Sequence, residues 1–183
     1  MSDPQPGLDP IAATQRWLER AVIGLNLCPF AKAVHVKGRI RWVLSDATDT
    51  EALLTQLAQE LQFLAAADPA QVETTLIVHP QVLAAFADYN DFLDLADAAI
   101  AALGLEGTLQ VASFHPDYRF AGTEADDITN ATNRAPHPTL HLLREDSITQ
   151  AVADTPDADQ IVERNLATLR RLGAAGWRRL FED

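Results

Sequence analysis

Apolar residues recur every three or four positions in four stretches of the chain, and this spacing predicts four amphipathic helices. The first begins at Asp9-Pro10, where the aspartate caps free amides and the proline fits the first turn. The second begins at a capping box formed by Thr48 and Glu51. Glycine or proline ends each of the four. The predicted helices cover residues 10–24, 48–68, 90–104 and 155–173.

Four shorter segments, rich in β-branched residues or alternating in polarity, predict strands. They span residues 39–45, 74–78, 109–114 and 139–143. The order of helices and strands predicts an α/β or α+β fold with a four-stranded mixed sheet covered by amphipathic helices. A ferredoxin-like sheet and an open, partly parallel sheet both satisfy this order. We expect residues 1–8 to form a flexible N-terminal tail and residues 9–183 to form a single globular domain.

Composition narrows the class of protein and the kind of partner. Hydrophobic residues make up 48% of the chain and charged residues 22%, which is typical of a globular protein. A net charge of -12 disfavours nucleic acid, and no stretch is apolar enough for a signal peptide or a membrane span. The lone cysteine, Cys28, excludes an intrachain disulfide. We therefore expect a cytoplasmic protein that binds neither nucleic acid nor membrane; its oligomeric state stays open, a homo-oligomer included.

One long segment between the third and fourth predicted strands has little apolar periodicity. It runs over residues 115–138 (HPDYRFAGTEADDITNATNRAPHP) and contains many turn-forming residues. A loop of this length in a compact domain is uncommon and is typically either functional or disordered. We therefore expect the functional site within residues 114–145, at this loop and the adjoining strand ends.

Three histidines are candidates for this site. His79 and His115 each follow a predicted strand, and parallel strands would bring both to one crevice, where open α/β sheets bind ligands. Alternation within TLHLL turns His141 away from its leucine neighbours, so that it would face the same crevice. His115 and His141, with Asp117 as an orienting carboxylate, fit general acid and base catalysis. His79, His115 and His141 fit a divalent metal such as zinc or iron, although structural histidines that donate to carbonyls are the alternative.

Polar residues on the returning arm of the loop predict an anion-binding group. A guanidinium binds a carboxylate or phosphate through two parallel hydrogen bonds, so Arg134 is the expected anchor for an anionic substrate. Asn133 and Tyr118 are expected beside it as further substrate-binding residues. A surface ion pair of Arg134 with Glu124 or Asp126 is the alternative.

Cys28 is a separate candidate, just beyond the first predicted helix. A thiolate near a histidine is a nucleophile, so Cys28 is included among the catalytic candidates. A cysteine flanked by leucine, proline and phenylalanine is also typical of a small buried hydrophobe.

Three motifs carry a resemblance to a known family. LCPFA at residues 27–31, FHPDYRFAGT at 114–123 and NRAPHPTLHLLRED at 133–146 resemble a family of bacterial proteins catalogued as a domain of unknown function. The resemblance covers nearly the whole chain and implies a bacterial cytoplasmic protein. It implies no activity, cofactor or catalytic residue. The family motif has an aromatic residue at the position of His137, so His137 is left out of the expected site.

These observations give a leading hypothesis and two alternatives. The leading one is a small-molecule enzyme that acts on a polar or anionic metabolite, with metal-assisted hydrolysis as the expected class. The first alternative is a non-catalytic ligand-binding or regulatory protein that uses the same loop. The second is a thiol-dependent enzyme that uses Cys28.

Overall fold

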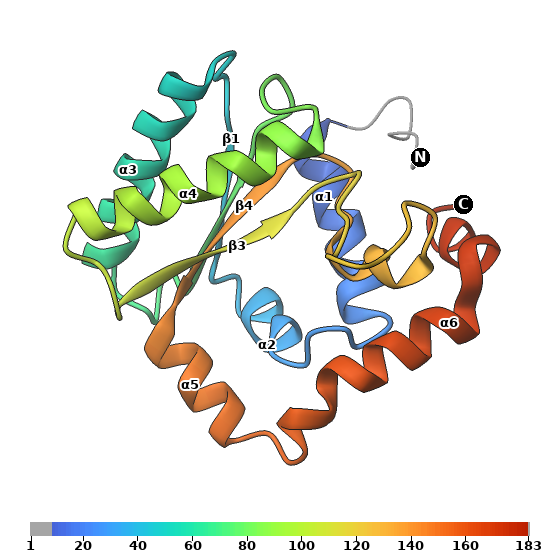
Figure 1. Ribbon diagram of the computed structural model, residues 1–183. Helices are drawn as coiled ribbons and strands as arrows, with labels where there is room; N and C mark the ends of the chain where they lie inside the picture. The colour runs from blue at the N-terminus through green and yellow to red at the C-terminus, as the bar shows by residue number, and fades with distance from the viewer. Residues whose placement is uncertain (1–8, 183) are drawn as a thin grey trace.

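A four-stranded open sheet lies at the centre of the computed structural model, which describes residues 9–182 (Figure 1). Its strands are β1 (Ile40–Leu44), β2 (Thr74–Val78), β3 (Leu109–Phe114) and β4 (Thr139–Arg144). They lie in the order β1-β2-β4-β3, with β1 parallel to β2 and β4 antiparallel to both β2 and β3. The expected open, partly parallel sheet is confirmed, and the fold is α+β. The ferredoxin-like alternative is wrong, because its parallel strands are separated by another strand.

Helices cover both faces of this sheet (Figure 1). One face carries α3 (Thr50–Ala66) and α4 (Phe86–Ala102), and the other carries α1 (Pro10–Trp17) with its π-helical continuation η1 (Leu18–Ile23). The remaining helical segments are α2 (Ala31–Val36), η2 (Ile128–Asn133), α5 (Glu145–Ala153), η3 (Ala158–Gln160) and α6 (Ile161–Arg179). Within residues 9–182, no helix combines the length and the apolar content that crossing a bilayer requires. The tail expected at residues 1–8 lies outside the described residues.

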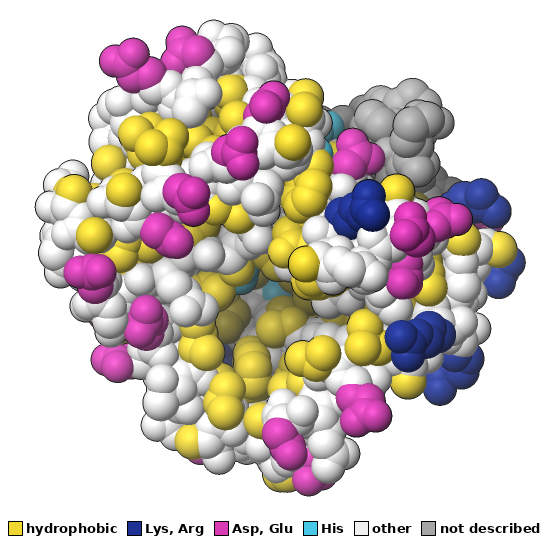
Figure 2. Space-filling view, viewed as in Figure 1, with side chains coloured by type: hydrophobic (Ala, Val, Ile, Leu, Met, Phe, Trp, Pro, Cys, Tyr) yellow, Lys and Arg dark blue, Asp and Glu magenta, His cyan; other side chains and the backbone are white. Residues whose placement is uncertain are grey.

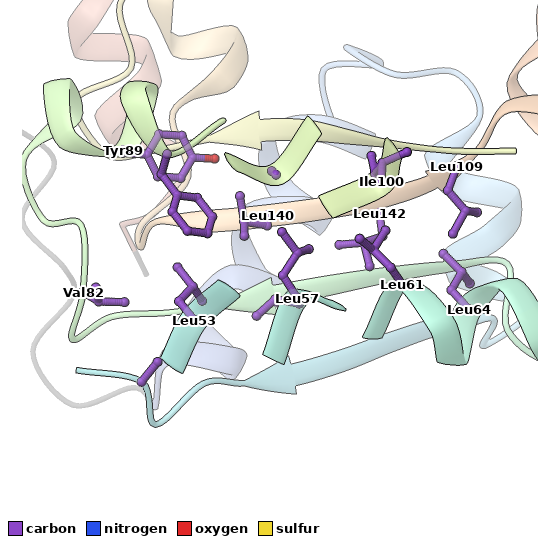
Figure 3. Packing of buried hydrophobic residues seen from close by; sticks show 14 residues of the cluster. Leu53, Leu57, Leu61, Leu64, Val82, Tyr89, Ile100, Leu109, Leu140 and Leu142 are labelled. Carbon is purple, nitrogen blue, oxygen red and sulfur yellow. The ribbon is translucent and has the colours of Figure 1, made fainter. Parts of the chain in front are cut away.

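Leucine side chains fill the core between the sheet and the α3–α4 layer (Figure 3). The core-facing leucines of α3 recur at three and four residues, so they share one side of the helix, point to the sheet and are fully buried. Burial of each such side chain stabilises the fold by roughly 1.5–3 kcal/mol. Residues of this core labelled in Figure 3 include Leu53, Leu57, Leu61 and Leu64 of α3, Tyr89 and Ile100 of α4, and Leu140 and Leu142 of β4.

A second apolar cluster joins the two ends of the chain on the opposite face of the sheet. Trp17, Leu18 and Val22 of α1 and η1 pack with Leu169 and Trp177 of α6. This contact explains the apolar spacing at both ends of the sequence. The cluster also brings α6 beside the first helix, although the main contact of α6 is with η2.

Local deviations from the predicted elements have identifiable causes. Asp49, rather than Thr48, caps α3, because its Oδ1 accepts from the Ala52 amide at 2.8 Å. Gly173 interrupts α6 with φ 67°, as expected of a helix stop, but the helix resumes because Trp177 is buried beyond it. The sequence pattern does not predict two short helices, α2 and α5. Neither has a buried residue, so neither carries the apolar repeat that marks a core helix.

Arg144 at the end of β4 closes the carboxyl end of α3. Its Nη2 donates to the carbonyls of Leu64, Ala67 and Val72 at 2.8 to 3.0 Å. These carbonyls lie at or beyond the last turn of α3, where no intrahelical amide is available. The guanidinium therefore ties α3 and the approach to β2 onto β4.

We expect Arg144→Met to lower the free energy of unfolding by about 2–4 kcal/mol, because partly buried carbonyls lose a charged donor. Urea denaturation measures this change. Arg164→Met, at an exposed position of α6, is the matched control and should change stability by less than about 0.5 kcal/mol. A loss at Arg144 no larger than that of the control would contradict the capping role.

Candidate functional site

The two faces of the sheet differ in how closely helices cover them. On the face of β4 that carries Leu140 and Leu142, α3 and α4 pack directly on the strands. On the other face, α1 packs on β1 and β2, whereas α6 packs chiefly on η2. In Figure 1, β3, η2, α5 and α6 surround α2 on this side of the sheet. The space-filling view shows a hollow in this part of the molecule, whose visible walls are largely hydrophobic and which has histidine atoms at its depth (Figure 2).

His141 lies on the hollow side of β4, paired in register with Leu76 of β2 and Ala112 of β3. Its Nε2 lies 2.7 Å from Thr74 Oγ1. The Thr74 hydroxyl donates its only proton to the Leu142 carbonyl, so the imidazole must be the donor in the contact with Thr74. Nδ1 is therefore the bare nitrogen of the ring, and it has no hydrogen-bond partner among residues 9–182.

The surroundings of His141 keep its ring neutral. Desolvation by burial lowers the pKa of His141 to about 4, and no charged group within residues 9–182 contributes to the shift. The Phe114 ring lies 6.0 Å from the imidazole, and Trp17 meets Phe114 edge-on at 5.2 Å. His141 is thus a neutral acceptor on an aromatic wall, with a hydroxyl holding its orientation.

His115 lies on the opposite side of the sheet, towards α4. Its Nε2 donates to the Leu83 carbonyl at 3.1 Å, and its Nδ1 accepts from the Asp117 amide at 3.0 Å. The ring packs against Phe86 and Tyr89 and is fully buried. Both ring nitrogens are therefore occupied. Asp117 orients this imidazole through its backbone amide rather than its exposed carboxylate.

His79 occupies an equivalent place at the end of β2. Its Nδ1 donates to the Val82 carbonyl at 3.1 Å, and its ring stacks on Tyr89 at 5.8 Å. Its Nε2 is buried and has no hydrogen-bond partner in the part of the chain that the structure describes. Desolvation lowers the pKa of His79 to about 4, and the pKa of His115 is lowered for the same leading reason. His79 and His115 thus each donate a ring N–H to a backbone carbonyl, as structural histidines do.

The long loop is held together by its own polar side chains. The fully buried Asn130 accepts from the Phe120 amide and donates to the Glu124 carbonyl, both at 2.9 Å. Arg134 donates from Nε to the Tyr118 carbonyl at 3.0 Å and from Nη2 to the Ala125 carbonyl at 2.7 Å. Turn formers and polar residues in this segment thus build a fixed loop, and Arg134 is one of its internal supports.

The remaining substrate-binding candidates also make structural contacts. Asn133 donates from Nδ2 to the Ser113 carbonyl at 3.0 Å and accepts from the His115 amide through its own carbonyl. Tyr118 packs its ring against Phe86 and Phe120 at 5.1 and 5.0 Å. These contacts bind the loop to β3 and to α4, on the side where His115 lies.

Cys28 lies between η1 and α2, half-buried against the second apolar cluster. No described residue forms a hydrogen bond with its sulfur atom. The base that a thiol nucleophile requires is therefore not paired with it in this conformation.

The expected single site is thus divided into separate places. His79 and His115 lie behind the strand ends next to α4, while His141 lies on the other face, because consecutive strand residues alternate between faces. Among residues 9–182, no three His, Cys, Asp or Glu side chains come together as a metal site. The expected trio of His79, His115 and His141 is not assembled.

Comparison with known proteins places the chain in a family. The model of a family described as a protein of unknown function (DUF1415) matches residues 9–179. The chain belongs to the DUF1415 family. No curated protein and no solved structure matches it. The expected resemblance to a domain of unknown function is thereby confirmed.

In this DUF1415 protein, sequence reasoning misses the partners that give His141 its properties. The pattern around Thr74 predicts only a buried strand, and the patterns around Phe114 and Trp17 predict only core positions. A threonine within an otherwise apolar strand is the available signal. The partnership itself depends on β4 pairing with β2, which no local pattern specifies.

His79 and His141, whose pKa values lie near 4, make the free energy of unfolding depend on pH. Each ring is neutral when folded but titrates at its ordinary pKa of about 6.5 when unfolded. The unfolded state therefore binds more protons, so stability is full above pH 6.5 and falls as the pH drops towards 4. We expect a loss of roughly 2 kcal/mol per histidine between pH 7 and 4.5 in urea denaturation. Over the same pH range, the His141→Gln variant should lose roughly 2 kcal/mol less of its free energy of unfolding than wild type. Equal losses in variant and wild type would contradict a neutral, buried His141 in the folded state.

Proposed function

We propose that this protein is an enzyme that acts on a small molecule bound in the hollow, with His141 as the group that transfers a proton. One observation carries the proposal: Nδ1 of His141 is bare and without a partner among residues 9–182, whereas Thr74 engages Nε2. A neutral imidazole with one nitrogen anchored and the other free is the arrangement a general base requires.

Thr74 has a defined part in this chemistry. By accepting from Nε2–H while donating to the Leu142 carbonyl, it fixes the tautomer that leaves Nδ1 free. A carboxylate in that position would also stabilise the imidazolium, but a hydroxyl does so only weakly. The protonated ring would therefore give up its proton more readily than an ordinary imidazolium. His141 accordingly takes a proton from the substrate and returns it within the same turnover.

Metal-assisted hydrolysis has less support than proton transfer within this proposal. The described residues contain no converging set of His, Cys, Asp and Glu ligands. Anchoring of an anion by Arg134 also has less support, because both hydrogen bonds described for its guanidinium go to carbonyls of the loop. Its remaining N–H groups are the ones that could take part. The lone cysteine and the acidic composition favour the cytoplasm as the place of action.

A non-catalytic ligand-binding protein is the second candidate function. It is favoured by the electrostatic isolation of His141, because burial causes its pKa shift and none of the charged groups within residues 9–182 adds to that shift. A catalyst that needs both an acid and a base would have to use His141 for both steps. Binding without conversion of the ligand would distinguish this candidate from the enzyme.

The proposed activity can be tested before the substrate is identified. Purified protein is incubated with a deproteinised metabolite extract, and mass spectrometry follows compounds that disappear and products that form. We expect a substrate–product pair with wild type that is reduced at least about a hundredfold with His141→Gln, since general base catalysis contributes 10²–10⁴-fold. His137→Gln is the matched histidine control and should retain conversion.

Thr74→Val provides an intermediate case, because it removes the hydroxyl that fixes the tautomer but leaves the ring. We expect it to lower the conversion rate without abolishing it. Equal conversion by wild type and His141→Gln would contradict the proposal. Retention of an extract compound without conversion would favour the ligand-binding protein.

A further inference from the structure

We infer that the ligand of the hollow has an apolar body and meets His141 through an uncharged donor such as a hydroxyl group. This inference deepens the proposed function and rests on it for the location of the site. It names the chemical class of the ligand, an aromatic or acyl compound with a neutral polar group. It also departs from the anionic metabolite that the sequence predicts.

The first support is the absence of charge around the imidazole. The described hydrogen bond of His141 goes to a neutral hydroxyl, and its ring contact is with the apolar Phe114. Among the described residues, no charged side chain contributes to the electrostatics of the ring. A carboxylate or phosphate placed there would lose its hydration without gaining a counter-charge, which is strongly unfavourable. A hydroxyl needs only one acceptor, and Nδ1 supplies it.

The second support is the character of the walls and the rim. Hydrophobic side chains dominate the hollow in the space-filling view (Figure 2). Along the lower rim, α5 and η3 contain no buried residue. Val152 of α5 and Val162 of α6 are 47% and 69% exposed. Hydrophobic walls around a concave surface are typical of a ligand-binding site rather than of a packed core.

The contacts of Arg134 and Arg144 agree with an uncharged ligand. Arg144 is directed to the end of α3, and Arg134 is directed to the loop carbonyls, so the hydrogen bonds described for them do not reach the hollow. Binding energy must then come from apolar contact and from the hydrogen bond to His141. Apolar contact gives affinity, whereas the bond to Nδ1 gives selectivity for a donor.

Three ring compounds of similar size test the inference directly. The probes are 2-naphthol, naphthalene and 2-naphthoate, which offer a neutral donor, no polar group and an anion. Each is titrated into the full-length protein at pH 7, and binding is followed by probe fluorescence and by chemical shifts of residues around the hollow. We expect 2-naphthol to bind about tenfold more tightly than naphthalene and 2-naphthoate to bind least tightly, since one hydrogen bond can contribute about 1.4 kcal/mol, which corresponds to a factor of ten.

The variant His141→Leu separates the hydrogen bond from the apolar contact. It should keep the affinity for naphthalene and lose the tenfold preference for 2-naphthol. If this variant fails to fold, the order of the three affinities for the wild-type protein still tests the inference. Tightest binding by 2-naphthoate, equal binding of all three, or no binding at the hollow would each overturn the inference. Proton transfer by His141 would fail separately, through unchanged conversion of extract metabolites by His141→Gln.

Discussion

The insertion of β4 between β2 and β3 is the constraint on which the rest of the structure depends. Because β4 is antiparallel and hydrogen-bonded on both sides, its alternate residues are divided between two different environments. Leu140 and Leu142 enter the core beneath α3 and α4, and His141 between them lies on the opposite face, against Phe114 and Thr74. A shift of the register by one residue would bury the imidazole in the leucine core. Stability and the candidate chemistry are therefore fixed by the same pairing.

The ends of the strands show how polar residues maintain this pairing. The His79 amide donates to the Pro138 carbonyl just before β4, and the His115 amide donates to the Asn133 carbonyl. The Tyr89 hydroxyl of α4 also links β4 to β3, because it donates to the Thr139 carbonyl and accepts from the Phe114 amide. The backbone amides of two histidines that look catalytic in the sequence thus help to hold β4 in place. Their buried imidazoles bond instead to the Val82 and Leu83 carbonyls and are kept neutral, since a charged ring would be costly there.

The sequence predicts the elements of this fold better than it predicts their partners. The segment Thr74–Val78 is found with the bounds expected from its β-branched composition, and so is Leu109–Phe114. Periodicity is a local property of the chain, so it is available from the sequence alone. Helices α2 and α5 escape prediction, because neither buries an apolar stripe.

The candidate site is predicted in part, for a related reason. Alternation shows that His141 faces away from its leucine neighbours, and this holds in the structure. The same reasoning places His115 beside it, but the chain continues its alternation past the end of β3 and turns His115 towards α4. The hydroxyl of Thr74 reaches His141 only through pairing across 67 residues of sequence. Non-local contacts of this kind cannot be read from a pattern along one segment.

The central claim is that His141 is a neutral imidazole with a bare Nδ1, and NMR of the 15N-labelled ring tests it most directly. Long-range proton–nitrogen correlations at pH 7 should show Nε2 protonated and Nδ1 unprotonated, and the ring should stay neutral until the pH approaches 4. The Thr74→Val variant should weaken the preference for this tautomer. A ring protonated at Nδ1, or one that titrates near its ordinary pKa of about 6.5, would contradict the claim.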